Sequence, residues 1–403
     1  MRIIVIIFFI SISPVYGQTD NFKVLLDSAK AEFKKDFEIQ DYGKAANYLE
    51  KAVSLNPRNS EARYFLGYAY SRLNSKDGRS MIDMNLDLVK KSSEQFESVI
   101  KLTPKYDGEL VILDPYSKIS SEWGSLAMSF WHNSKPDSAI WAFNQGKRAG
   151  GFKKYHIEVN RKVLNACSPN SILISSGDSF TILLWYLQIA EGFRKDVSVI
   201  DISLLNSNWY PSYLSNNKVV SFDLPKTMLD TLDYCMWKDS TIKIKNFKWT
   251  IKPSYVENYL LRGDRIFLSL LKKNNFQREI FFTTGFEESY RLSLKEYLKP
   301  LFVVDKLMVN KSSKFNEVEL EKEVKDALKL SVLIDKNSFD ELQLLDILRY
   351  NIYEIANIYL KKNDKKGAKR WVNLIDEYCN EKSFPLQSEE GKMYSKQFRK
   401  QLQ

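Results

Sequence analysis

The sequence has few of the residues on which most catalytic and metal centres depend. It holds three cysteines and two histidines among 403 residues, and its 15 glycines form no phosphate-binding motif. Cys167, Cys235 and Cys379 are too widely spaced for a disulfide framework or a zinc knuckle, so we expect buried free thiols. His132 and His156 form no His-x-x-x-His pair, and no Gly-x-Ser-x-Gly motif occurs. We therefore expect no metal and no cofactor, and the sequence favours a non-enzymatic protein.

Long apolar runs are also missing after the first residues. The nearest, Ile172 to Ala190, is interrupted by a glycine, an aspartate and several polar residues. Because a transmembrane helix needs about 20 apolar residues, we expect no membrane span there.

The first residues resemble a secretory signal peptide. Arg2 precedes the apolar run Ile3 to Ile10, and the small residues Val15 and Gly17 precede Gln18 at the positions that signal peptidase prefers. We expect cleavage after Gly17 and export to the periplasm or the exterior of a bacterial cell. The alternative is an uncleaved anchor that tethers the protein to the membrane.

The charge of the chain is positive but spread out. Its formal net charge is +10, with lysines and arginines scattered along helical segments, and 44% of its residues are hydrophobic. A basic surface attracts nucleic acid, anionic lipid or acidic glycan, and the nucleic-acid interpretation fits an exported protein poorly. The length predicts two or three globular domains.

Paired-helix repeats occupy the first part of the chain. Small and aromatic residues recur at the spacing of the 34-residue tetratricopeptide repeat, in which small side chains let two helices approach closely. An insertion at about 76–88 separates the helices of the second repeat, and one further pair of this type follows near the carboxyl end, turning at Asn363 and Asp364. The residues predicted to pack these repeats are Ala45, Ala52, Leu66, Gly67, Tyr70, Trp123, Leu126, Ala127, Ala139, Phe143, Ala356, Tyr359 and Ala368.

Between these repeats the hydrophobic period changes. Ser171–Ser176 and Val197–Ile202 are short apolar runs typical of buried strands, and Phe180–Phe193 between them is typical of a helix. Strand, helix and strand at this spacing predict a parallel βαβ unit with a right-handed crossover.

The rest of the middle region predicts further small elements. They are a short helix over 204–210 that Ser203 opens and Pro211 closes, a hairpin or edge strand over 241–251, a helix over 262–274, and strands over 279–284 and 301–304.

Several segments then carry a resemblance, in order and over roughly residues 155–385. They are Asn170–Asp178, Leu184–Val197, Asp201–Tyr210, Glu279–Thr284, Ser293–Leu298 and Arg349–Pro385. This region is similar to the soluble carboxyl-terminal region of bacterial protein O-mannosyltransferase-like membrane proteins of unknown function. The resemblance implies a shared extracytoplasmic accessory domain. It implies no transferase activity, because the glycosyltransferase-like features of the relatives lie in their membrane part. The residues after Asp178 also depart from the relatives' more acidic pattern.

The polar residues after the two predicted strands form the candidate binding cleft. Ligands of open α/β sheets bind beyond the carboxyl ends of the strands, where helix amino termini converge. Carboxylates there suit sugar hydroxyls or a cation, while the plain alternative is a glycine turn with Asp178 or Ser179 capping the helix. The candidate residues are Ser176, Gly177, Asp178, Ser179, Asp201, Asn206 and Asn208.

These patterns together predict an α plus α/β fold. We expect a signal peptide over 1–17, repeats over 18–153, an α/β domain over 154–312 resting against the repeats, and helices over 313–403. The leading functional hypothesis is an exported binding or scaffold protein that holds envelope proteins or peptides on its repeats, accessory to envelope glycosylation or surface assembly. The alternative is a domain that binds or acts on carbohydrate or nucleotide-sugar through the Gly177–Asp178 cleft.

Overall fold

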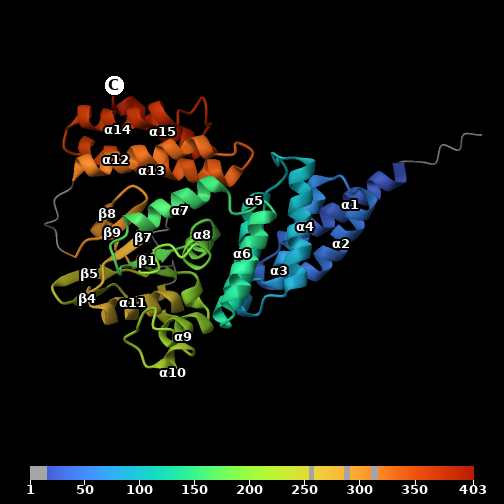
Figure 1. Cartoon of the computed structure of the whole chain (residues 1–403), viewed down its shortest axis with the longest axis horizontal. Coiled ribbons are helices and arrows are strands. Elements are labelled where there is room, and N and C mark those ends of the chain that lie inside the picture. Colours follow the sequence, from blue (N-terminus) through green and yellow to red (C-terminus); the bar gives the residue numbers. More distant parts are fainter. Residues whose placement is uncertain (1–15, 254–257, 286–290, 310–315) are drawn as a thin grey trace, which may run out of the picture.

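Three packed helix pairs form the amino-terminal part of the protein (Figure 1). The computed structural model describes residues 16–253, 258–285, 291–309 and 316–403. The pairs are α1 (Tyr16–Phe33) with α2 (Tyr42–Leu55), α3 (Ser60–Asn74) with α4 (Leu86–Leu102), and α5 (Pro115–His132) with α6 (Pro136–Arg148). Two 3-10 turns, η1 (Phe37–Ile39) and η2 (Gly78–Asp83), join helices, and η2 lies in the predicted insertion. Residues 1–15 of the proposed signal segment lie outside the described part of the chain. A cut after Gly17 would fall in the first turn of α1.

The residues predicted to pack the repeats face the helix interfaces. All of them are buried except Tyr359, which is half-buried. A Cβ atom added at Gly67 would lie 2.8 Å from the Phe96 ring, so the small residue permits the close approach of α3 and α4. Polar residues cap the helices: Asp41 accepts from the Lys44 N–H of α2, and Asn59 accepts from the Ala62 N–H of α3.

The middle of the chain contains the predicted sheet. Its five strands have the order β2-β1-β7-β9-β8, in which β1 is parallel to β2 and β7, and β9 is antiparallel to β7 and β8. Every residue of β1 is buried, as expected for a central parallel strand. The strands are β1 (Ile172–Ser175), β2 (Ser198–Asp201), β7 (Ile280–Thr283), β8 (Leu298–Pro300) and β9 (Val304–Leu307).

Helices and two strand pairs surround this sheet. The predicted hairpin is present as β4 and β5, in which Phe247 and Trp249 are buried and Lys248 between them is exposed. The elements are α7 (Lys154–Ala166), α8 (Asp178–Ile189), η3 (Leu204–Asn206), α9 (Trp209–Asn216), α10 (Lys226–Leu229), β3 (Cys235–Met236), β4 (Ser240–Ile244), β5 (Phe247–Ile251), β6 (Tyr259–Leu260), α11 (Arg262–Asn274) and η5 (Lys295–Tyr297).

Two local predictions in this region are wrong. The helix expected over 204–210 is a 3-10 turn followed by α9, and Pro211 lies in the first turn of α9 instead of ending a helix. Proline is well tolerated there, because the first N–H groups of a helix have no partner within it. The strand expected over 301–304 is mostly the turn between β8 and β9, with Phe302 at a φ of 73°.

Helices return at the carboxyl end and pack beside α7 and the sheet (Figure 1). They are α12 (Glu317–Leu328), the 3-10 turn η6 (Lys329–Leu333), α13 (Phe339–Leu360), α14 (Lys365–Tyr378) and α15 (Glu389–Gln401). The turn predicted between α13 and α14 is present, with Asn363 at a φ of 59° and Asp364 capping α14. Helical repeats, a sheet with parallel strands and carboxyl-terminal helices thus confirm the α plus α/β fold.

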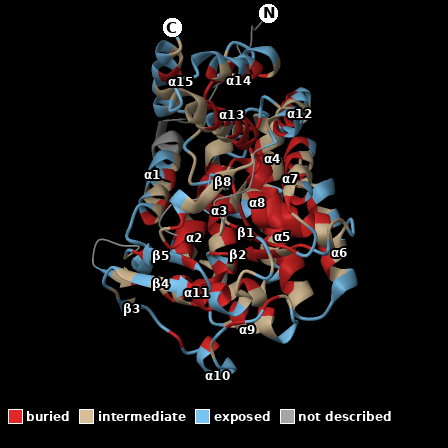
Figure 2. Cartoon of the chain, turned by 90° about the vertical axis from the view of Figure 1, so that its left-hand side faces the viewer, coloured by how far each residue is buried: buried red, intermediate tan, exposed pale blue. Residues whose placement is uncertain are grey.

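One continuous hydrophobic core runs through all three parts. It extends from Leu26 of α1 to Phe398 of α15, and its buried residues concentrate around α5, α8 and β1 (Figure 2). The helices α5 and α6 pack against α8, so the α/β part rests on the third repeat. The division into separate domains at 153/154 and 312/313 stays a prediction.

The amino termini of α5 and α13 meet in a buried polar network. Asp114 caps α5 by accepting from the Ser117 N–H, and its other oxygen accepts from the Ser338 hydroxyl at 2.6 Å and the Asp340 N–H at 3.1 Å. The Asp114 N–H in turn donates to the Asp340 carboxyl at 2.9 Å. Burial, with a further contribution from Asp114, raises the pKa of Asp340 to about 7. This network joins the repeats to the carboxyl-terminal helices.

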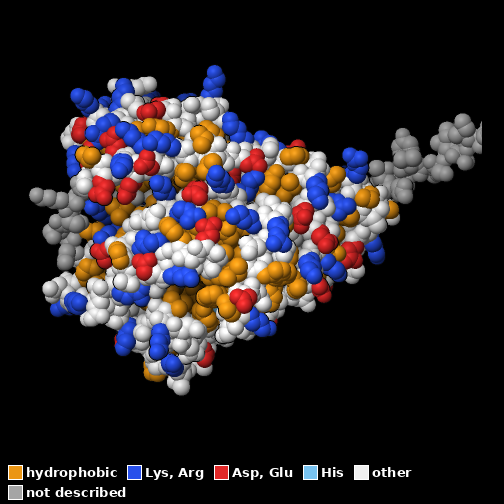
Figure 3. All heavy atoms as spheres, in the orientation of Figure 1, with side chains coloured by type: hydrophobic (Ala, Val, Ile, Leu, Met, Phe, Trp, Pro, Cys, Tyr) orange, Lys and Arg blue, Asp and Glu red, His pale blue; other side chains and the backbone are white. Residues whose placement is uncertain are grey.

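The three thiols are free and the positive charges of the visible surface are dispersed (Figure 3). Cys167 and Cys379 are buried, and burial raises the pKa of Cys167 to about 12. Lysine and arginine side chains are spread over the face seen in Figure 3 instead of forming one block. Among the described helices, none has the length and apolarity needed to cross a membrane.

Candidate functional site

A cavity lies where the repeats meet the sheet. Its volume is about 270 Å³, and its walls come from α3, η2 and α5 on one side and from α8 and the end of β2 on the other. Gly177, Asp178 and Asp201, which are three of the predicted cleft residues, line it. The carboxyl edge of the parallel strands therefore opens toward the first helices of the second and third repeats, and not toward open solvent alone.

The turn from β1 into α8 places Asp178 at the cavity. Gly177 has a φ of 78°, a conformation that side chains other than glycine rarely adopt, and no side chain caps α8. The capping interpretation of Asp178 and Ser179 is therefore wrong. The Asp178 carboxylate instead accepts a hydrogen bond of 2.5 Å from the Ser121 hydroxyl of α5, which ties the sheet edge to the repeats.

Asp201 forms the floor of the site at the end of β2. One of its oxygens accepts from the Thr181 hydroxyl at 2.6 Å and the other from the Leu204 N–H at 2.9 Å, and only 5% of the residue is exposed. Burial raises the pKa of this carboxyl to about 6, and the nearby charge of Asp178 acts in the same direction.

The repeats contribute a buried ion pair. Lys118 and Glu122 of α5 are 7% and 3% exposed, and the ammonium lies 2.6 Å from one carboxylate oxygen, Oε1. The same ammonium lies 5.0 Å from the centre of the Tyr68 ring of α3. Glu122 Oε2 is buried and has no hydrogen-bond partner among the described residues. The sequence interpretation missed these residues.

Four of the predicted cleft residues do not line the cavity. Ser176 is half-buried outside it, and the Ser179 carbonyl accepts from Asn160 of α7. Asn206 accepts from the Gly263 N–H of α11 at 2.8 Å, so it positions that helix. Asn208 is exposed at the start of α9. Its amide makes no capping bond to that helix.

A helical pattern could have pointed to the repeat wall. Lys118, Ser121, Glu122 and Ser125 recur at the three- and four-residue spacing of one helix face. Such a polar stripe is ordinarily read as a solvated surface, whereas three of these four residues are buried here. A polar stripe on an otherwise apolar repeat helix therefore marks a face that meets another polar surface.

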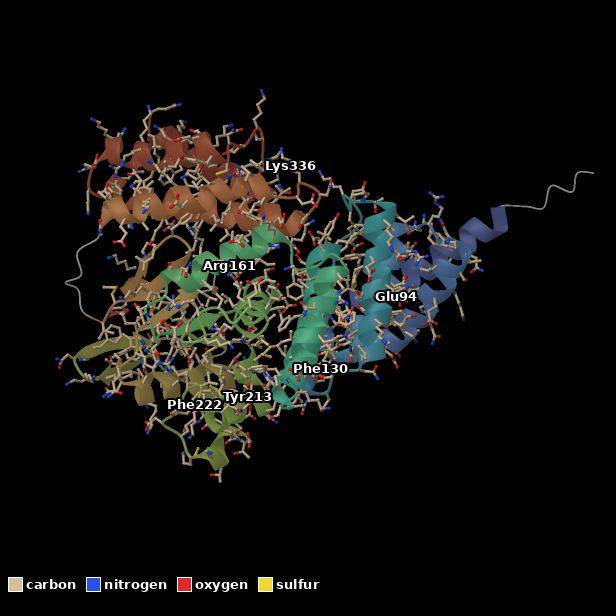
Figure 4. All side chains as sticks on the ribbon, viewed as in Figure 1. Glu94, Phe130, Arg161, Tyr213, Phe222 and Lys336 are labelled. Carbon is tan, nitrogen blue, oxygen red and sulfur yellow. The ribbon has the colours of Figure 1, made fainter. Side chains whose placement is uncertain are left out.

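The other end of α5 closes the junction through aromatic packing. The His132 ring lies 4.1 Å from the Tyr213 ring of α9 and 4.6 Å from that of Trp209, and burial lowers the pKa of His132 to about 4. Figure 4 marks Tyr213 and, on α5, Phe130 at this end of the junction. The neutral imidazole belongs to the interface that holds the two walls of the cavity together.

The lining determines which ligands the cavity suits. Its charged groups are four carboxylates and two cations, and its other polar side chains are serines, a threonine, Tyr68 and Trp185. No three histidine, cysteine, aspartate or glutamate residues in the described parts of the chain are grouped to hold a metal ion. The site thus suits a ligand that forms hydrogen bonds and is attracted by the negative charge of the lining.

The raised pKa of Asp201 predicts that the free energy of unfolding depends on pH, and that Asp201→Asn removes this contribution. The folded state favours the protonated acid, so this contribution to stability is complete below the usual pKa of 3.8 and is lost as the pH rises through about 6. The free energy of unfolding of Asp201→Asn minus that of the wild type should therefore increase between about pH 4.5 and 7.5, by at most about 1.4 kcal/mol per pH unit. Urea denaturation at several pH values measures it.

Asp196→Asn is the matched control for that titration. A hydrogen bond from Arg194 lowers the pKa of Asp196 to about 2, so this carboxyl is ionised in both states above about pH 4.5. Its difference from the wild type should stay constant over the same range. A constant difference for Asp201→Asn as well would show that Asp201 is ionised in the folded protein.

Two family models match parts of this chain. A tetratricopeptide repeat model matches residues 37–59, which include α2, and a model described as TMEM260-associated domain 2 matches residues 157–254. The second match includes the β1–α8 turn and the end of β2 but not the repeat wall of the cavity. No curated protein matches the sequence. The amino-terminal helices thus include a tetratricopeptide repeat, a unit that generally mediates contacts between proteins.

Proposed function

We propose that this protein is a scaffold that binds another protein or a peptide, with the cavity between the repeats and the sheet as the point of recognition. The observation that carries this proposal is the bond between Ser121 of α5 and Asp178 of α8, which joins a repeat helix and the sheet edge into one polar site. Repeat surfaces hold partner chains, and sheet edges of this kind hold small polar groups. A site built from both suits a polypeptide with one distinctive group.

The first repeat provides room for the rest of such a partner. It lies far from the sheet, and nearby apolar side chains are exposed: Phe37 by 44%, Ile39 by 66% and Leu73 of α3 by 44% (Figure 1). Exposed apolar side chains are typical contact points for partner proteins.

The cellular setting is part of the proposal. The signal-like first 17 residues support a position outside the cytoplasm, in the periplasm or at the cell surface. The resemblance to O-mannosyltransferase-like membrane proteins supports a role beside envelope glycosylation or surface assembly. The partner is then another envelope protein, and no nucleic acid is involved.

A second candidate function is binding of a carbohydrate or nucleotide-sugar in the same cavity. Its serine and threonine hydroxyls, such as Ser125 and Ser203, and the carboxylate of Asp178 are partners for sugar hydroxyls. Trp185 also lines the cavity and offers a ring on which a sugar can stack.

The variant Asp178→Ala tests the proposed function. It removes the acceptor of the Ser121 bond at an exposed position, so the protein should fold while the affinity for the partner falls roughly ten-fold. The partner is first captured from envelope fractions and identified by mass spectrometry. Titration calorimetry with the purified partner then gives the affinity.

The matched control is Asp137→Ala, an exposed aspartate in the first turn of α6 that does not line the cavity. It should bind the partner like the wild type. Equal partner affinities for the wild type and Asp178→Ala would contradict the proposed site. A purified oligosaccharide that the wild type binds and Asp178→Ala does not would favour the carbohydrate function.

A further inference from the structure

One buried carboxylate oxygen of Glu122 lacks a hydrogen-bond donor among the described residues. Glu122 is 3% exposed and lines the cavity, and its Oε1 atom pairs with Lys118 while Oε2 has no partner among the described residues. A buried acceptor without a donor destabilises the folded protein, and more so when it belongs to a charged group. A ligand with N–H or O–H donors would supply what this oxygen lacks.

The cations of the cavity are already engaged. Lys118 is held between Glu122 and the Tyr68 ring, and Arg72 donates to the Lys76 carbonyl at 2.8 Å. The carboxylates outnumber them two to one, and one of these, Asp178, is exposed toward the cavity. The field in the cavity therefore favours a positive charge, although the amino terminus of α8 by itself favours a negative one.

The size and walls narrow the class of cation. The volume of about 270 Å³ is at the lower end for a small-molecule site and holds a short head group. The absence of a metal-binding group of side chains among the described residues disfavours a metal ion. The Trp185 ring in the lining suits an organic cation.

We propose that the cavity binds a protonated primary amine, the amino-terminal ammonium of a partner polypeptide, through Glu122 and Asp178. An ammonium group has three N–H donors, which match Glu122 Oε2, the carboxylate of Asp178 and a hydroxyl of the lining. This inference rests on the proposed function and names the group of the partner that the scaffold recognises.

Titration calorimetry with three small probes tests the inference. The probes are triglycine amide, the same peptide with an acetylated amino terminus, and Nα-acetyl-lysine amide. We expect triglycine amide to bind at pH 7 and the acetylated peptide to bind at least roughly ten-fold more weakly. The affinity for triglycine amide should also fall above about pH 8, where a free amino terminus loses its proton. Equal affinity for Nα-acetyl-lysine amide would show that a side-chain amine is the source, and would overturn the assignment to a chain terminus.

Variants separate this inference from the proposed function. Glu122→Gln keeps the shape of the side chain and should weaken the binding of triglycine amide at least roughly ten-fold. The control Glu50→Gln, whose side chain bonds to Tyr70 outside the cavity, should bind like the wild type. Should Glu122→Gln fail to fold, Asp178→Asn on the exposed turn serves instead. Failure of every amine probe to bind, or unchanged binding in these variants, would overturn the inference. In that case the purified partner would still lose affinity in Asp178→Ala if the proposed function holds.

Discussion

Asp114→Ala should reduce the free energy of unfolding by about 3 kcal/mol or more. The carboxylate accepts three hydrogen bonds, from the Ser117 N–H, the Ser338 hydroxyl and the Asp340 N–H, and only 2% of the residue is exposed. Its removal leaves buried donors without acceptors at two helix amino termini. Part of this cost is offset, because the neighbouring Asp340 carboxyl would no longer face a second carboxyl. Urea denaturation of the purified protein measures the change.

Asp41→Ala is the matched control for this experiment. Asp41 also caps a helix by accepting one backbone bond, from the Lys44 N–H at 2.9 Å, but it is exposed. Its loss should cost about 1 kcal/mol, the ordinary value for a helix cap. If Asp114→Ala costs no more than Asp41→Ala, the network between α5 and α13 does not stabilise the fold as its geometry indicates.

The strands and repeats were predictable because each has a local signal. Ile172–Ser175 is a run of buried apolar residues, and Phe247–Ile251 alternates between buried and exposed residues, so both follow from the period of the sequence. The strand Val304–Leu307 has a buried residue only at each end and follows a turn, so it offers no clear period. The α9 helix was misplaced because proline was read as a stop, although it also fits a first turn.

Only half of the candidate site was predictable, and the reason lies in tertiary packing. Gly177 and Asp178 follow a buried strand, a local signal that places them at the sheet edge. Ser121 and Glu122 are more than 50 residues earlier in the chain and reach the same cavity only because α5 packs on α8. The polar stripe of α5 marks a face that meets a polar surface, but no local pattern specifies that this surface is the edge of a distant sheet. The contact between these two helices therefore decides whether the site exists.

The two helices approach each other closely at Gly124 of α5. A Cβ atom added there would lie 2.2 Å from Cγ2 of Ile182 in α8, so Gly124→Ala forces the helices or the isoleucine to shift. Crowding of this kind costs typically 1–3 kcal/mol, while alanine returns up to about 1 kcal/mol through its helix propensity. We expect a net loss of about 1–2 kcal/mol and weaker ligand binding in the adjacent cavity. Urea denaturation and titration calorimetry measure the two effects.

A second glycine and a double variant test whether the contact with Ile182 causes the loss of stability in Gly124→Ala. At Gly43 of α2 the added Cβ would meet Asp41 Oδ1 at 3.4 Å, an ordinary contact, so Gly43→Ala should be neutral or slightly stabilising. Ile182→Ala removes the methyl group that the new Cβ strikes, so Gly124→Ala should cost less in that background, with a coupling of about 0.5–3 kcal/mol. An equal cost in both backgrounds would mean that the approach of α5 to α8 is set elsewhere. The cavity would then owe its shape to the Ser121–Asp178 bond and the buried ion pair of α5, which respond to charge and not to volume.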